Sequence, residues 1–231
     1  MHTKTFLSIA EAAYVAGLKE PAITNAIRDG IVSAPLISSA RVRYVSRLAA
    51  AFISFYCATD KLIPHRHRKA ALQSSMELIA AAGKIRHALD LNLTSEDFEF
   101  DQALMKHIEN AAVRSQKLDT TLHAISVSSD VMWGMPVFKG TRVLVETIVG
   151  SVEEGTSLAS LKDSYAFLTE DLVDAAKIYT EIHPFQGRVQ HISDSNPACK
   201  LKSVEIVHPI KNELAPIHRR MPVTKPGDYG T

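Results

Sequence analysis

The stretch that most restricts the fold runs from residue 130 to residue 184. Its centre is the turn-forming segment Gly-Met-Pro-Val-Phe-Lys-Gly-Thr-Arg at residues 134–142. Pro136 fixes its own φ, has no N–H group and pushes the preceding residue toward extended geometry. Gly140 allows a turn at positive φ, and the side chain of Thr141 can bond to the nearby backbone. The apolar pair at 137–138 is too short for a strand of its own, so a compact turn is predicted here.

Three short helices are predicted to follow this turn, each with its own start and stop signal. The first has apolar residues at i, i+3, i+4 and i+7 from Val145 to Val152, and Gly155 lies just past its end. Ser157 and Thr169 can cap the second and third helices. Pro184 ends the third helix, because proline cannot extend it. Three helices joined by tight turns indicate a helix-turn-helix-like module.

This order of residues resembles the antitoxin-type helix-turn-helix domain often encoded beside PIN-like toxin genes, as in the larger VapB-type antitoxins. The resemblance covers about a quarter of the chain. The motif residues that carry it are Gly134, Pro136, Gly140, Thr141 and Arg142. Leu144 departs from it, since such sequences commonly have proline there. The resemblance implies an antitoxin that inhibits a PIN-like ribonuclease toxin and represses its own operon. Arg142 would bond groups of the third helix or contact phosphate.

Composition sets broad limits on the rest of the chain. Its 231 residues are 46% hydrophobic and 22% charged, which is ordinary for a soluble globular protein of two or three modules. The net charge of +1 means that any DNA contact must come from a local patch. Cys57 and Cys199 lie in unlike surroundings, which favours free thiols in a reducing compartment. With neither a signal peptide nor an apolar run long enough for a membrane span, a cytoplasmic location is expected.

Residues 1–62 carry the signals of a separate helical module. Ser8 can cap a short helix that Gly17 ends. After a tight turn, Pro21 suits the first position of a second helix, which stops at Gly30.

An extended segment is then predicted from Ile31, period-two alternation from Arg41 to Val45, and a longer helix capped by Ser46. Helix, turn, helix, hairpin and helix in this order resemble a winged helix-turn-helix domain of the MerR or excisionase type. The resemblance implies that the second helix enters the major groove and the wing meets the backbone. The residues predicted to contact DNA are Lys19, Thr24, Asn25, Arg28, Arg41 and Arg43. The alternative is that these side chains form solvated surfaces.

The connecting region, residues 63–129, is predicted to combine helices with a small sheet. A basic run from His65 to Lys69 lies at the start of a helix, where positive charge opposes the helix dipole. It indicates either an anionic partner such as a DNA phosphate or a solvated face. Strands are predicted at 89–93, 98–100 and 122–127, and a helix from Asp101 to about Leu118.

No metal site and no cofactor are predicted. The histidines of the connecting region lack the spacing of metal ligands. They are His65, His67, His87, His107 and His123. The chain also has no P-loop, GxGxxG or GxSxG motif and no nucleophile signature around either cysteine, so it is not expected to be an enzyme.

The third helix of the central module has a polar face that disfavours DNA. Its members are Glu170, Asp171, Asp174, Lys177 and Glu181. Four acids and one base would repel a polyanion. We therefore expect this module to dimerise or to bind a protein partner, and a homodimer would suit a palindromic operator.

Residues 185–231 are rich in proline and predicted to form an extended tail. Between residues 210 and 221, apolar anchors alternate with basic residues, a pattern typical of segments that fold on a partner. The residues expected to bind the toxin are Ile210, Leu214, Ile217, Arg219 and Arg220. One of the two arginines would pair with the metal-binding carboxylates of the nuclease implied by the resemblance. The alternative is a tail without function.

The predicted fold class is mainly α with small β elements (α+β). It comprises a winged helix-turn-helix domain (1–62), connecting helices and a small sheet (63–129), a second three-helix module (130–184) and a tail (185–231). The predicted function is an antitoxin that binds both operator DNA and a ribonuclease. The rival is a stand-alone MerR-like transcription regulator whose second half dimerises or binds a ligand.

Overall fold

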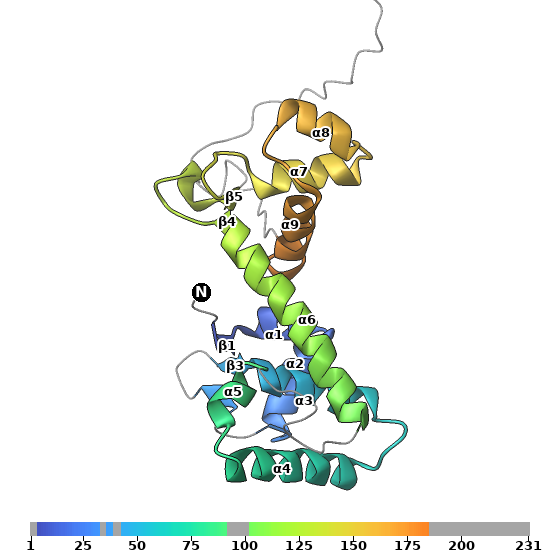
Figure 1. Ribbon diagram of the computed structural model, residues 1–231. Coiled ribbons are helices and arrows are strands. Elements are labelled where there is room, and N and C mark those ends of the chain that lie inside the picture. The colour runs from blue at the N-terminus through green and yellow to red at the C-terminus, as the bar shows by residue number, and fades with distance from the viewer. Residues whose placement is uncertain (1–3, 33–35, 39–42, 92–101, 185–231) are drawn as a thin grey trace, which may run out of the picture. The chain divides into compact units, whose positions relative to one another are not determined.

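The computed structural model describes residues 4–32, 36–38, 43–91 and 102–184, and within these it is mainly helical with two small antiparallel sheets (Figure 1). This confirms the predicted fold class. In chain order the elements are β1 (Phe6–Leu7), α1 (Ile9–Ala16), α2 (Glu20–Arg28), β2 (Ile37–Ser38), β3 (Tyr44–Ser46), α3 (Arg47–Ala58), α4 (His65–Ala81), α5 (Ile85–Leu89), α6 (Gln102–Ala124), β4 (Ile125–Ser126), η1 (Met132–Gly134), β5 (Val137–Phe138), α7 (Val145–Glu153), α8 (Leu158–Ser164) and α9 (Glu170–Ile182). None of the described helices combines the length and the apolar character that crossing a bilayer requires.

The first helix begins with a reciprocal cap. The Ser8 hydroxyl accepts a hydrogen bond from the Glu11 N–H at 3.3 Å, and the Glu11 carboxylate accepts one from the Ser8 N–H at 2.7 Å. Gly17 ends the helix in the left-handed region, at φ 67°. The predicted start and end of this helix are thus confirmed, and α2 follows after a short turn.

The wing is a three-stranded sheet in the order β1-β3-β2, with β3 in the centre. Leu7 and Ile37 both pair with Val45 from opposite sides. Strand β1 lies in a segment for which no strand was predicted. The extended segment predicted from Ile31 is confirmed at β2 but begins later than predicted, because the Ile31 N–H bonds to the Ala26 carbonyl at 3.0 Å and ties this residue to the end of α2.

A single apolar core unites the N-terminal elements with α4, α5 and α6. The first two turns of α3 are fully buried in it, and α1 and α6 pack against α3. The buried positions of α6 recur at helical spacing. They are Leu104, Ile108, Ala111, Ser115, Leu118 and Thr121.

Two strands predicted in the connecting region are replaced by helical structure. The strand predicted at 122–127 is wrong for its first half, because helix α6 continues to Ala124 and leaves only a two-residue strand, β4. The strand predicted at 89–93 is also wrong for its described part, because a helical turn ends at Leu89 and brings Ala88 and Leu91 into the core. The strand predicted at 98–100 lies outside the described residues.

A second apolar core lies among β4, β5 and the three helices α7–α9. The three helices match the prediction, including the caps at Ser157 and Thr169. The expectation that residues 137–138 form no strand is wrong. Phe138 pairs with Ile125 in the β4–β5 ladder, because the partner strand comes from the end of α6.

Candidate nucleic-acid and partner-binding surfaces

Helix α2 presents a polar face to solvent and an apolar face to the core. Thr24, Asn25 and Arg28 are exposed, whereas Ile23 and Ala26 are buried. The exposed side chains therefore point where an external molecule can reach them. Lys19 lies next to this face, as the exposed N-cap residue of α2 without a side-chain cap bond.

Arg28 is only weakly held within the protein. Its Nε lies 3.2 Å from Asp29 Oδ1, and both side chains are more than half exposed. Exposed ion pairs of this kind contribute little free energy, so Arg28 can exchange its partner for a phosphate or a base. Asp29 also lowers the positive potential of this face.

The wing contributes one described cation of the predicted pair. Arg43 is exposed directly before β3, whereas Arg41 lies outside the described residues. Lys4 was not among the predicted residues, and its Nζ lies 3.0 Å from Glu11 and 5.8 Å from the centre of the Tyr44 ring. Burial would raise the pKa of Glu11, but its hydrogen bonds with Ser8 and Lys4 outweigh burial and lower that pKa. Lys4 is thus held by contacts within the protein.

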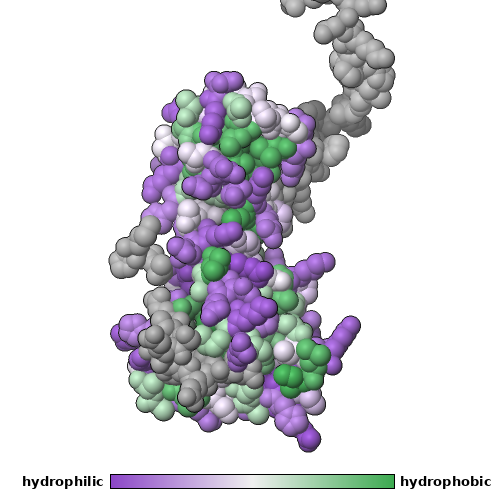
Figure 2. All heavy atoms as spheres, turned by 45° about the vertical axis from the view of Figure 1, so that its right-hand side comes forward, coloured by the Kyte–Doolittle hydropathy of each residue, from purple (hydrophilic) through white to green (hydrophobic). Residues whose placement is uncertain are grey.

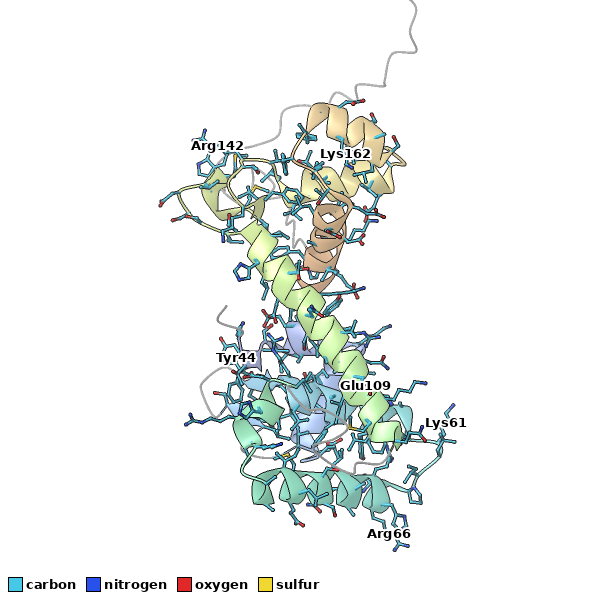
Figure 3. All side chains as sticks on the ribbon, in the orientation of Figure 1. Tyr44, Lys61, Arg66, Glu109, Arg142 and Lys162 are labelled. Carbon is cyan, nitrogen blue, oxygen red and sulfur yellow. The ribbon has the colours of Figure 1, made fainter. Side chains whose placement is uncertain are left out.

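The basic run at the start of α4 divides into an outer and an inner part. Arg66 is exposed and extends away from the protein in Figure 3, as does Lys61 in the loop before α4. Arg68 is buried: it donates to the Tyr56 carbonyl and to Asp60 at 2.6 Å each, and its guanidinium lies 4.1 Å from the Tyr56 ring centre. Arg68 therefore fixes α4 to the end of α3 and cannot meet an outside anion.

The histidines and the described cysteine have ordinary structural surroundings. His107 shares a hydrogen bond of 3.0 Å with Ser54, and burial, with a smaller effect of Lys106 and Arg114, lowers its pKa. Burial raises the pKa of the Cys57 thiol. Within the described parts of the chain, no three His, Cys, Asp or Glu side chains are grouped as metal ligands.

The motif residues of the second module build a tight turn. The Thr141 hydroxyl donates to the Phe138 carbonyl at 2.9 Å and accepts from the Val143 N–H at 3.1 Å, while Gly140 has φ 79°. The Pro136 carbonyl accepts from the N–H of Val145 at 3.0 Å and so fixes the start of α7. Gly134, at φ 81°, closes the preceding turn.

Arg142 lies at the surface of this turn (Figure 3). No hydrogen bond or ion pair joins it to another described residue. Its charge is free to meet an external group, and its predicted bonds to the third helix are not present among the described residues.

Helix α9 has the acidic surface predicted for it. The buried positions are Val173, Ala175, Ala176 and Ile182, and the exposed ones are Glu170, Asp171, Asp174, Lys177 and Glu181. In Figure 2, hydrophilic residues interleave with smaller hydrophobic patches on one face of the molecule. The exposed face of α9 is thus suited to a cationic partner.

Trp133 is a surface residue that was not among the predicted site residues. Its side chain is 90% exposed, and both Met132 and Trp133 have positive φ, at 47° and 54°. A lone tryptophan directly before glycine in a turn-rich segment was the signal available in the sequence.

An open cleft of about 990 Å³ lies beside the turn between α1 and α2. Tyr14, Lys19, Arg114 and Glu181 are among its lining residues. The guanidinium of Arg114 packs against Gly17 and occupies the place that a Cβ there would take. Burial, and then Glu181, raise the pKa of Tyr14.

The five residues predicted to bind a toxin lie outside the described residues, so the structure gives no geometry for them. They are Ile210, Leu214, Ile217, Arg219 and Arg220.

The second module, and the chain over most of its length, are similar to known proteins. Residues 125–180 match the family model described as "Protein of unknown function (DUF433)". The uncharacterized protein y4eO of Sinorhizobium fredii (strain NBRC 101917 / NGR234) is 26% identical over 192 residues, which cover 81% of this chain and 86% of y4eO. The crystal structure of Rv2018 from Mycobacterium tuberculosis is 16% identical and covers 75% of this chain and 97% of Rv2018. Its TM-score of 0.35 is too low to support an argument about fold. The segment from β4 to α9 is therefore similar to the DUF433 family.

Proposed function

We propose that this protein is the antitoxin of a bacterial toxin–antitoxin pair. Its winged helix-turn-helix domain binds operator DNA in the cytoplasm and represses the operon. Its second module and residues 210–221 bind and inhibit a PIN-like ribonuclease. The observation that carries the proposal is the opposite charge of the two folded modules.

The charges are divided between the modules as these roles require. Residues 1–62 carry seven lysines and arginines against four acids, whereas residues 125–184 carry nine acids against four lysines and arginines. DNA attracts the first set and repels the second, because its phosphates form a dense line of negative charge. DNA binding is therefore assigned to the first module and protein binding to the second.

The exposed face of α2 supports the DNA role. Short polar side chains at Thr24 and Asn25 suit hydrogen bonds with base edges, and Arg28 suits a base or a phosphate. Arg43 in the wing suits a backbone phosphate, a contact that positions the domain without reading sequence. A homodimer would place two such helices on the half-sites of a palindromic operator.

The toxin role rests on the resemblance of the turn motif and on the composition of the tail. In the implied nuclease, a cluster of carboxylates holds a divalent cation. The guanidinium of Arg219 or Arg220 would pair with these carboxylates and displace the metal. The chain itself would carry out no reaction.

Co-purification tests this proposal directly. The chain should pull down the nuclease encoded beside its gene, and the complex should cleave RNA more slowly than the free nuclease. A chain that ends at Pro209 should inhibit less well. If it inhibits as well as the full chain, the tail has no part in inhibition. If no nuclease binds the full chain, the antitoxin role is wrong.

The open cleft favours a second candidate function, a stand-alone MerR-like regulator. Its volume of about 990 Å³ is sufficient for a small ligand, and it adjoins the turn before α2. This function requires that a small molecule change the affinity for DNA with no nuclease present. DNA affinity that is indifferent to small molecules but altered by the nuclease would exclude it.

A further inference from the structure

The loop between β4 and β5 forms a defined arch, which we call the Trp133 arch, residues 128–135. The Val131 N–H donates to the Ser128 carbonyl at 3.0 Å, and the Gly134 N–H donates to the Val131 carbonyl at 3.1 Å. The Met135 N–H donates to the Met132 carbonyl, also at 3.1 Å. Successive backbone bonds therefore hold the arch in one conformation.

This arch holds Trp133 in an unfavourable backbone conformation and leaves its side chain exposed. Met132 and Trp133 both adopt the left-handed backbone region, which is costly for residues that have a Cβ. The indole is 90% exposed, and Val127 at the base of the arch is 57% exposed. An indole that is exposed to water contributes little to the stability of the described chain. A preorganised, exposed tryptophan is the usual form of an anchor for a binding partner.

The charge of the module decides which partner fits the anchor. With nine acids against four lysines and arginines, residues 125–184 repel nucleic acid and anionic lipid, and a second copy of the module would bring like charges together. A protein with a cationic face is attracted instead. Cationic faces that also have a pocket for a flat ring are typical of proteins that bind single-stranded RNA, because bases stack there while phosphates meet lysine and arginine.

We propose that the Trp133 arch docks on the RNA-binding face of the partner nuclease, where the indole takes the place of an RNA base. The exposed Asp130 of the arch takes the place of a phosphate. This inference rests on the proposed antitoxin function and adds a contact independent of the tail. The chain therefore competes with RNA for the nuclease.

The sole tryptophan of the chain gives a direct readout. The full chain is titrated with the nuclease encoded beside its gene, in a variant of the nuclease whose own tryptophans are replaced by phenylalanine. Emission from Trp133 should shift to shorter wavelength and lose its quenching by acrylamide. An uncleavable 2′-O-methyl oligoribonucleotide should reverse both changes. A complex that forms with unchanged Trp133 emission would contradict the inference.

Three substitutions of Trp133 distinguish the contribution of its aromatic ring from that of its backbone conformation. Trp133→Ala should weaken nuclease binding at least about 30-fold, as expected for an anchor residue. Trp133→Phe should retain most of the affinity, because a flat ring remains. Trp133→Gly should lose affinity as the alanine variant does, yet be no less stable than the natural chain, because glycine adopts positive φ without strain.

Leu62→Ala provides the matched control, since Leu62 is 80% exposed in the loop between α3 and α4. It should leave nuclease affinity unchanged. Equal affinity of the natural chain and Trp133→Ala would overturn the inference. So would a blue shift that depends on the concentration of the chain alone, which would identify a second copy as the occupant. Failure of the full chain to bind the nuclease at all would instead overturn the antitoxin function and, with it, this inference.

Discussion

Arg47 of α3 and Asp119 of α6 form a bidentate ion pair across 72 positions of sequence. Nη1 lies 2.8 Å from Oδ2 and Nη2 lies 2.5 Å from Oδ1, while Nε donates to the Lys4 carbonyl at 3.1 Å. The Arg47 side chain is only 3% exposed. One guanidinium thus joins the N-terminal segment, α3 and α6.

Removal of Asp119 should destabilise the fold strongly. The variant Asp119→Ala leaves the buried Arg47 without its charge partner, and we expect a loss of about 3 kcal/mol in the free energy of unfolding. Urea unfolding measures it. Asp171→Ala, on the exposed face of α9, should change the stability by less than about 0.5 kcal/mol. Equal stability of the two variants would show that the ion pair contributes little.

Gly17 should tolerate alanine less well than Gly30 does. Both have positive φ, so alanine should cost about 1 kcal/mol at either position. At Gly17 the new Cβ must also displace the Arg114 guanidinium, whereas the space at Gly30 is open. We therefore expect a loss of about 2 kcal/mol for Gly17→Ala in urea unfolding.

A double variant isolates the contribution of this contact. In an Arg114→Ala background, Gly17→Ala should cost no more than Gly30→Ala does, because nothing then occupies the place of the Cβ. A full cost in both backgrounds would mean that the backbone conformation of Gly17, and not Arg114, sets the penalty.

His107 should make stability fall as the pH drops below about 6.5, the ordinary pKa of histidine. Burial lowers the pKa of His107 in the folded state. As the pH falls, His107 is therefore protonated in the unfolded chain at a higher pH than in the folded chain, and this stabilises the unfolded state relative to the folded state. The contribution of His107 is complete above about pH 6.5 and is lost as the pH falls through the lowered pKa. Thermal unfolding between pH 7.5 and 5.5 should show a smaller decline for His107→Gln.

The exposed His123 on the same helix gives the control for this effect. His123→Gln should decline with pH as the natural chain does. If His107→Gln also behaves like the natural chain, another group accounts for the acid sensitivity.

Helix starts were predictable because their signals are local. Ser8, Ser46, Ser157 and Thr169 each accept a hydrogen bond from a backbone N–H three residues later, so the short sequence window contains both partners. The exposed acids of α9 were predictable for the same reason, from helical spacing alone.

The features that were predicted wrongly or not predicted depend mostly on contacts between residues distant in the sequence. Strand β5 depends on β4 beyond the predicted module, and the inward position of Arg68 depends on Tyr56 and Asp60 at the end of α3. The left-handed conformation of Trp133 is the exception, because the arch is closed by hydrogen bonds between residues three positions apart, which leave no hydrophobic or charge pattern in the sequence. No periodicity or charge pattern contains these partners.

We propose that the first module binds DNA and that the acidic second module does not. Fluorescence anisotropy of the labelled upstream region, measured with the full chain over a range of salt concentrations, tests it most directly. The variant Arg28→Ala with Arg43→Ala should weaken binding and reduce the slope of log K against log salt by about two. Lys162→Ala with Lys177→Ala removes the same charge from the second module and should leave both quantities unchanged. Loss of DNA binding in the lysine variant, with full binding in the arginine variant, would contradict the account.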